Sequence, residues 1–116
     1  MLKIIAKDFS RSPFGRSKVD SKHNGTKFRE LFLKGWIEES IKDGKKLTLD
    51  FNGLDIPMTS SFMEESFGGL IRFGHFKKET VLEVLDFKSK DETYVEEILF
   101  YINDAKYDPD AEMYEM

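Results

Sequence analysis

Cysteine is absent from this sequence of 116 residues, and proline and tryptophan are scarce, with 3 and 1. Without a thiol the chain cannot form a disulfide, use a thiolate nucleophile, or bind zinc or an iron–sulfur cluster through cysteine. Because disulfide-free chains are typical of the reducing cytosol, we expect a cytoplasmic protein. The two histidines, His23 and His75, lack the i, i+4 spacing of a helical metal site, and no glycine-rich nucleotide loop is present. We therefore expect neither a metal nor a cofactor.

Long hydrophobic runs are also missing. No apolar stretch approaches the roughly 20 residues that span a bilayer, and Lys7 and Asp8 interrupt the N-terminal segment before the core of a signal peptide could form. We expect a protein that neither spans a membrane nor is exported. The formal net charge is −4, and five of the acids lie in residues 104–116, so the remainder is nearly neutral. A neutral body makes nucleic acid an unlikely partner, since phosphate contacts need a clustered basic surface.

The chain nevertheless contains enough apolar material for one core. Hydrophobic residues make up 40% of it, and 11 of its residues are Phe. At this length a single domain is the expectation. We place the domain at residues 1–106 and an acidic, flexible C-terminal tail at residues 107–116, where Pro109 and the acids leave no periodic apolar face.

The spacing of apolar residues predicts strands that alternate with helices. This alternation indicates an α/β fold, with a small mixed sheet of roughly four strands packed against helices. The predicted strands cover residues 2–8, 46–52 and 84–88, with 16–19 as an optional fourth strand. The predicted helices cover residues 26–43 and 77–83, and two further helices begin near residues 61 and 90. One long strand over residues 80–87 is the alternative to the helix of residues 77–83 and the strand of residues 84–88.

Two of these helices begin at patterns typical of capping boxes. Ser61 is followed by Glu64, and Ser89 by Glu92, each at the three-residue spacing that lets the two side chains cap the helix start. The first of these helices contains the pair Gly68-Gly69, whose members each cost about 1 kcal/mol relative to Ala in a helix interior. We interpret the pair as a close approach to the sheet or to a partner.

The run from Ser60 to Leu70, Ser-Ser-Phe-Met-Glu-Glu-Ser-Phe-Gly-Gly-Leu, resembles the STAS-like domain family of largely unknown function. The resemblance covers most of residues 2–105 and implies a STAS-like α/β domain. More distantly, the chain is similar to the STAS domains of bacterial anti-anti-sigma factors. That similarity implies a non-enzymatic signalling protein in transcription regulation, which binds a histidine-kinase-like ATPase and is controlled by serine phosphorylation. Further matching residues are Gly15-Arg16, Gly25, Phe28-Arg29-Glu30, the segment from Leu49 to Leu54, and the segment from Leu85 to Ser89.

The resemblance places the phosphoacceptor at the start of the helix, with Ser60 as the first candidate and Ser61 as the second. In the anti-anti-sigma factors an Asp precedes the acceptor, and Thr59 stands there in this chain. Free N–H groups and the helix dipole at such a position can accommodate a phosphate. The competing interpretation is that one serine is simply the N-cap. The predicted partner-binding residues are Thr59, Ser60, Phe62, Glu65, Gly68 and Gly69.

An alternative function follows from the triplet that contains Asp86 and Lys88. An acid two residues before a lysine on a strand occurs in metal-dependent nucleases, with Asp50 or Asp55 as a second carboxylate ligand and the lysine stabilising developing charge. The competing interpretation is that Asp86 and Lys88 form the solvated face of a strand whose other side chains point inward.

Overall fold

The computed structural model describes residues 1–116 and contains three short parallel strands in the order β1-β2-β3. They are β1 (Leu2–Ile4), β2 (Leu47–Asp50) and β3 (Leu85–Lys88), with Leu2 opposite Thr48 and Asp50 opposite Lys88. The predicted α/β class is confirmed. The predicted mixed sheet of four strands is wrong, because all three strands are parallel and no fourth strand joins them.

The predicted strand over residues 2–8 is correct only in its first half. After Ile4 the chain leaves the sheet and makes one helical turn, α1 (Ile5–Asp8). The carboxylate of Asp8 accepts the N–H of Ile4 at 2.7 Å. The N–H of Ile4 therefore binds a side chain at the point where the strand was expected to continue.

Residues 16–19 form turns and bends rather than the optional strand. Gly15 adopts a left-handed conformation with φ of 74°. The carboxylate of Asp20 accepts the N–H groups of Arg16 and Ser17 at 2.8 and 3.2 Å. A side chain that binds two successive N–H groups stabilises a tight turn, and these N–H groups can then no longer donate to a neighbouring strand.

The helix predicted over residues 26–43 is confirmed, with an irregular middle. It consists of α2 (Gly25–Phe28), a π-helical segment η1 (Arg29–Leu33) and α3 (Lys34–Asp43), and it ends at Gly44 in the left-handed conformation. The later helix has the same construction. It consists of α4 (Ser60–Met63), the π-helical η2 (Glu64–Gly68) and α5 (Gly69–Arg72).

Both predicted capping boxes are wrong. The N-cap of α4 is Thr59, whose hydroxyl accepts the N–H of Phe62 at 3.3 Å, so Ser61 lies inside the helix. The helix α7 (Glu92–Asp104) is capped by Asp91, whose carboxylate accepts the N–H of Thr93 at 3.0 Å. In each case a second capping residue stands two positions from the predicted one, and tertiary contacts decide between them.

The short helix predicted over residues 77–83 corresponds to α6 (Lys78–Val84), which leads directly into β3. The alternative of one long strand is therefore wrong. None of the helices has the length and apolar composition needed to cross a membrane.

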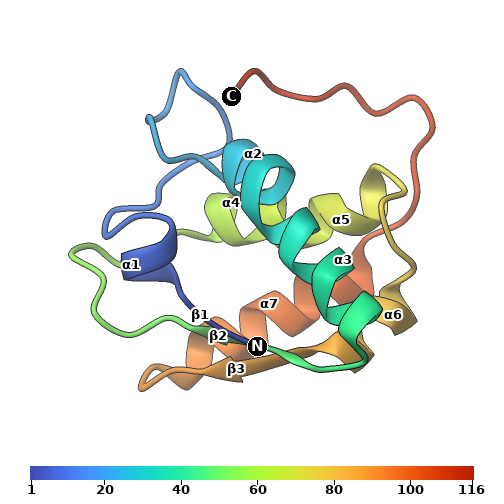
Figure 1. Ribbon diagram of the computed structural model, residues 1–116. Helices are drawn as coiled ribbons and strands as arrows, with labels where there is room; N and C mark the ends of the chain where they lie inside the picture. Colours follow the sequence, from blue (N-terminus) through green and yellow to red (C-terminus); the bar gives the residue numbers. More distant parts are fainter.

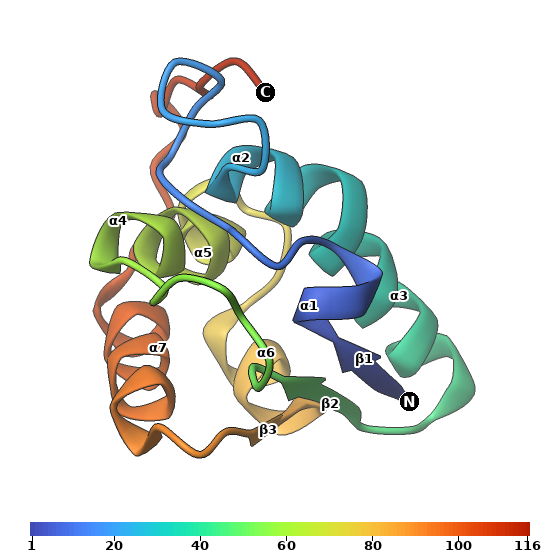
Figure 2. The same ribbon diagram turned by 90° about the vertical axis from the view of Figure 1, so that its left-hand side faces the viewer.

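The helices cover one face of the sheet, which lies at the edge of the molecule (Figures 1 and 2). Alternate residues of the central strand region, Leu47, Leu49 and Phe51, are buried beneath them. On the opposite face, Asp86 and Lys88 are exposed, as the interpretation of a solvated face predicts. The 17 residues of the core come from every layer of this arrangement: Ile5, Phe28, Leu33, Ile37, Leu47, Leu49, Phe51, Met58, Phe62, Met63, Phe67, Leu70, Ile71, Val81, Leu85, Ile98 and Ile102.

The C-terminal tail turns back after α7 and runs toward the loop that precedes α2 (Figures 1 and 2). The N–H of Asp108 donates to the carbonyl of Arg72 at 2.9 Å, and the N–H of Lys18 donates to the carbonyl of Glu115 at 2.9 Å. The tail therefore contacts the body at both of its ends. Its flexibility in solution stays a prediction.

Candidate functional site

The N-terminus of α4 presents the predicted phosphoacceptors. Ser60 is exposed, and its hydroxyl donates to Oε1 of Glu97 on α7 at 2.9 Å. Ser61 is half-buried, and its hydroxyl lies 3.1 Å from that of the capping Thr59. The two serines therefore differ in accessibility, since only Ser60 offers its oxygen at the surface.

Glu97 links this helix start to neighbouring side chains on α7. Its Oε1 accepts the hydroxyl of Tyr101 at 3.3 Å in addition to that of Ser60. Three residues after Glu97 on the same helix, Phe100 is 62% exposed, although large aromatic side chains are usually buried. The surface around Ser60 therefore combines its hydroxyl with the carboxylate of Glu97 and the hydroxyl of Tyr101.

Four of the six predicted partner-binding residues point into the molecule. Phe62 and Glu65 are each 1% exposed, and Gly68 and Gly69 are buried. Thr59 and Ser60 are the two that reach the surface. The sequence motif alone could not distinguish the two surface residues from the four buried ones, because the face that a helix buries depends on the elements that pack against it.

The buried members of the motif form a network of charges where the helix of residues 25–43 crosses the helix of residues 60–72. The guanidinium of Arg29, 0% exposed, donates through Nη1 to Oε2 of Glu65 at 2.7 Å and through Nε to Oε2 of Glu30 at 2.8 Å. Arg29 also stacks on the ring of Phe73, with 4.6 Å between Cζ and the ring centroid. A buried arginine of this kind needs such partners, since an unpaired charge in the interior is very costly.

Two further arginines extend the network to the surface. Arg16 and Arg72 each donate to Glu64 at 2.6 Å, and they lie 3.2 and 3.4 Å from Glu65. Burial opposes ionisation of Glu64, but the hydrogen bonds from Arg72 and Arg16 outweigh it and keep the pKa of this carboxyl below its ordinary value.

At the other end of the network, Nε2 of His75 lies 2.6 Å from Oε2 of Glu30. Here too burial raises the pKa of Glu30, while the hydrogen bonds from Arg29 and His75 lower it by more. Three carboxylates thus face three arginines, so the network is close to neutral and offers no excess charge to a ligand.

The glycines of the motif make room for this network. A Cβ atom at Gly69 would overlap the guanidinium of Arg29, 2.9 Å from its Cζ, and one at Gly68 would overlap the carboxylate of Glu64. A Cβ atom at Gly25 would lie 3.0 Å from the Phe62 carbonyl on the facing helix. The close approach inferred from the glycine pair is therefore an approach to side chains of the same chain.

Each of the crossing helices is π-helical at the crossing itself. Arg29 and Glu30 lie in η1, and Glu64 and Glu65 lie in η2. π-Helical turns are rare and occur frequently at functional sites. Sequence reasoning noticed these residues through the resemblance but did not pair them, because Arg29 and Glu65 are far apart in the chain. The available signal was that each residue stands one helical turn from a glycine, Arg29 from Gly25 and Glu65 from Gly69.

The residues of the nuclease alternative do not form a metal site, although Asp50 lies opposite Lys88 on the neighbouring strand. Asp86 lies 3.8 Å from Lys46, and Asp55 forms a 2.9 Å ion pair with Arg11. Asp50 accepts the N–H of Asn52 at 2.9 Å. No group of three or more His, Asp or Glu side chains is arranged to bind a metal ion.

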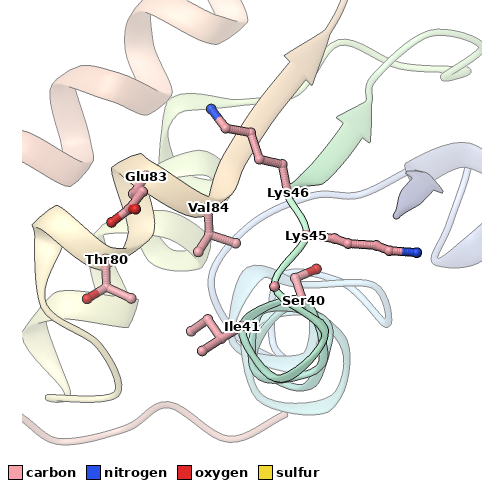
Figure 3. A pocket seen from close by; sticks show the side chains of 8 residues that line it. Ser40, Ile41, Lys45, Lys46, Thr80, Glu83 and Val84 are labelled. Carbon is pink, nitrogen blue, oxygen red and sulfur yellow. The ribbon is translucent and has the colours of Figure 1, made fainter.

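A cavity of about 400 Å³ lies between the C-terminal end of α3 and α6, at the other end of the helix of residues 25–43 from the charge network (Figure 3). Ser40, Ile41, Thr80, Glu83 and Val84 line it. The two lysines at its rim extend their amines away from the cavity (Figure 3). With no convergent polar groups inside, this cavity has no features of a built ligand site.

Residues 24–95 match the family model described as a STAS-like domain of unknown function. The match covers more than half of the chain, so the protein is a STAS-like α/β domain and belongs to this family. It contains both crossing helices, the predicted serines and β3, whereas the tail lies outside it. No curated protein and no solved structure matches the chain.

Proposed function

We propose that this chain is a non-enzymatic regulatory domain that binds a partner protein at the N-terminus of α4, with Ser60 as the residue that controls binding. The partner is a histidine-kinase-like ATPase of the anti-sigma type, which phosphorylates Ser60. The observation that supports this proposal is the exposed Ser60 hydroxyl in the first turn of a helix, hydrogen-bonded to Glu97 on α7, the helix that also carries the exposed Phe100. An exposed aromatic ring can anchor a partner, and a modifiable hydroxyl can make the contact sensitive to phosphorylation.

Phosphorylation would change this surface locally. A phosphate adds about −1.5 to −2 charges at neutral pH. The modified Ser60 could no longer donate its proton to Glu97, and the two groups would repel each other. At the same time the N–H groups at the helix start would favour the phosphate. The domain stays folded while the surface seen by the partner changes.

The modification is tested by incubating the purified chain with Mg-ATP and the histidine-kinase-like ATPases of its source, followed by phosphopeptide mapping. We expect phosphate on Ser60, loss of phosphorylation in Ser60→Ala, and normal phosphorylation in Ser61→Ala. Phosphate on Ser61 alone would reverse the assignment, and no phosphate on either serine would remove the switch.

Binding is tested by calorimetry with the same ATPases. We expect Ser60→Asp and Phe100→Ala each to weaken binding at least tenfold, and the exposed Lys42→Ala on α3 to leave it unchanged. Absence of binding by the unmodified chain, or equal binding by all of these variants, would contradict the proposal.

A further inference from the structure

The tail crosses the end of the molecule opposite the sheet (Figure 1), and a cavity lies between it and the body. We define the tail groove by the residues that contact the tail: Lys18, Asn24, Arg72, Phe73 and Gly74. The Arg72 end of the groove lies at the C-terminal end of the helix of residues 60–72, whereas Ser60 lies at its N-terminal end. At 1.5 Å per residue these two helix ends are about 18 Å apart, so this end of the groove is separate from the surface around Ser60.

The tail is bound in the way that an extended peptide is bound. Its backbone donates to the carbonyl of Arg72 and accepts from the N–H of Lys18, each at 2.9 Å. Asn24, which is 0% exposed, donates through Nδ2 to the carbonyl of Met116 at 3.1 Å. A buried side-chain amide that binds a main-chain carbonyl is typical of a preformed peptide-binding site. Because the contact is made to the main chain, it does not depend on the side chains of the bound peptide.

Two side chains of the tail have their own places in the groove. The ring of Tyr107 lies over Gly74, where a Cβ atom would come within 2.8 Å of it. Glu115 forms an ion pair with Lys18, and this hydrogen-bonded pair lowers the pKa of Glu115. The groove thus accepts an aromatic ring at one end and a carboxylate at the other.

The tail nevertheless fills the groove poorly. A cavity of about 500 Å³ remains between the tail and the body, lined on the body side by Phe73 and by Arg16 and Arg72 with their partners Glu64 and Glu65, and on the tail side by Asp108, Ala111, Glu112 and Tyr114. The rings of Tyr107 and Tyr114 are 65% and 51% exposed. Because exposed ion pairs and exposed hydrogen bonds contribute little to stability, the tail is a weak occupant.

We propose that the tail groove is a docking site for an extended acidic segment of a partner protein, and that residues 107–116 occupy it until that segment displaces them. The segment carries a carboxylate that pairs with Lys18 and an aromatic side chain that packs on Gly74. It also fills the space over Arg72 and Phe73 that the tail leaves open. To displace the tail, a partner segment must therefore bind the groove more tightly than the tail does.

The test uses the full chain and a fluorescein-labelled peptide of residues 107–116 as the probe, with binding measured by anisotropy. The double variant Asp108→Pro/Glu115→Lys opens the tail, since it removes the N–H that binds Arg72 and reverses the charge that pairs with Lys18. We expect this variant to bind the peptide at least tenfold more tightly than the wild type does. Glu112→Lys makes the same charge change without breaking an ion pair, and it should bind like the wild type.

The groove itself is tested on the opened-tail background. Lys18→Ala should weaken peptide binding about twofold to fivefold, as expected for an exposed ion pair, and the exposed Lys42→Ala should not change it. Equal binding by the wild type and the opened-tail variant, absence of binding by both, or indifference to Lys18→Ala would each overturn the proposal. A concentration-dependent dimer of the wild type on size-exclusion chromatography would also overturn it, by showing that the groove exchanges tails between copies.

Discussion

The helix crossing and the tail groove each connect distant parts of the chain through an ion pair, yet the two pairs do different work. At the crossing, the side chains of Arg29 and Glu65 are 0% and 2% exposed, and in the groove those of Lys18 and Glu115 are 60% and 74% exposed. A buried pair cannot lose one partner cheaply, because the other charge is left without solvent. An exposed pair can be broken at almost no cost, because water replaces the partner.

This difference distinguishes a rigid centre, the helix crossing, from a surface contact that can be replaced, the tail in its groove. The crossing joins the two long helices through Gly25 and Gly69 at distances that admit no larger residue. The predicted phosphoacceptor and the Arg72 end of the tail groove lie at the two ends of one of these helices. The network therefore sets the geometry of both surfaces, and its outer members Arg16 and Arg72 line the cavity in the groove.

The largest effect is expected for Arg29→Ala, which deprives the buried Glu65 of its closest partner and leaves only the longer contacts with Arg16 and Arg72. We expect a loss of about 3–5 kcal/mol in the free energy of unfolding, measured by urea denaturation. The double variant Arg29→Met/Glu65→Met removes both charges and should recover most of that loss. A loss below about 1 kcal/mol for Arg29→Ala would show that the pair does not stabilise the crossing.

A smaller loss is expected for Gly69→Ala, because the new methyl group would overlap the guanidinium of Arg29. We expect a destabilisation of about 1–3 kcal/mol by urea denaturation, as for overpacking in a core. Gly35 is the matched control, since it is also helical and a Cβ atom there has nothing within 4 Å. Gly35→Ala should stabilise the protein by about 0.5–1 kcal/mol. Equal effects of the two substitutions would contradict the close approach.

The cap of α4 provides the next prediction. Thr59→Ala removes the acceptor of the Phe62 N–H and should cost about 1 kcal/mol in thermal or urea unfolding. Ser61→Ala removes only a hydroxyl that contacts Thr59 and should change the stability by less than about 0.5 kcal/mol. The reverse order would assign the cap to Ser61.

The smallest effect is expected in the groove. Deleting residues 108–116 removes mainly exposed contacts, and we expect the thermal midpoint to change by no more than a few degrees in calorimetry. Lys18→Ala should leave the midpoint unchanged while it weakens peptide binding. A large drop on deletion would show that the tail is part of the folded core, and would remove the contrast with the crossing.

Much of the local structure could be predicted from the sequence. The strict alternation around Leu47 and Leu49 predicted β2, and the stop at Gly44 predicted the end of α3, because both signals depend on neighbours in the chain. The predicted caps at Ser61 and Ser89 were wrong, since in each case another residue with the same capping ability stood two positions away. Local patterns are ambiguous wherever two nearby residues can make the same hydrogen bond.

The candidate site, too, could be predicted from the sequence only in part. Its resemblance to the STAS-like family singled out the serines, the glutamates and the glycines as one motif, and the family match agrees. The motif did not reveal that Glu65 and Gly69 face Arg29 while Ser60 faces Glu97 and solvent. Those orientations depend on which helix packs against which face.

The sequence by itself determined the alternation of helices and strands, the family and the acidic character of the tail, because these properties are set by residue type and by spacing within a few turns of chain. Only the tertiary structure decided that the sheet has three parallel strands, that Thr59 caps α4, and that Arg29 is buried against Glu65. The sheet and the contact of Arg29 with Glu65 are choices between partners that are distant in the sequence, whereas the cap is a choice between two nearby hydroxyls. Burial makes that choice, since a charge or an N–H group removed from water must find a partner wherever the fold provides one.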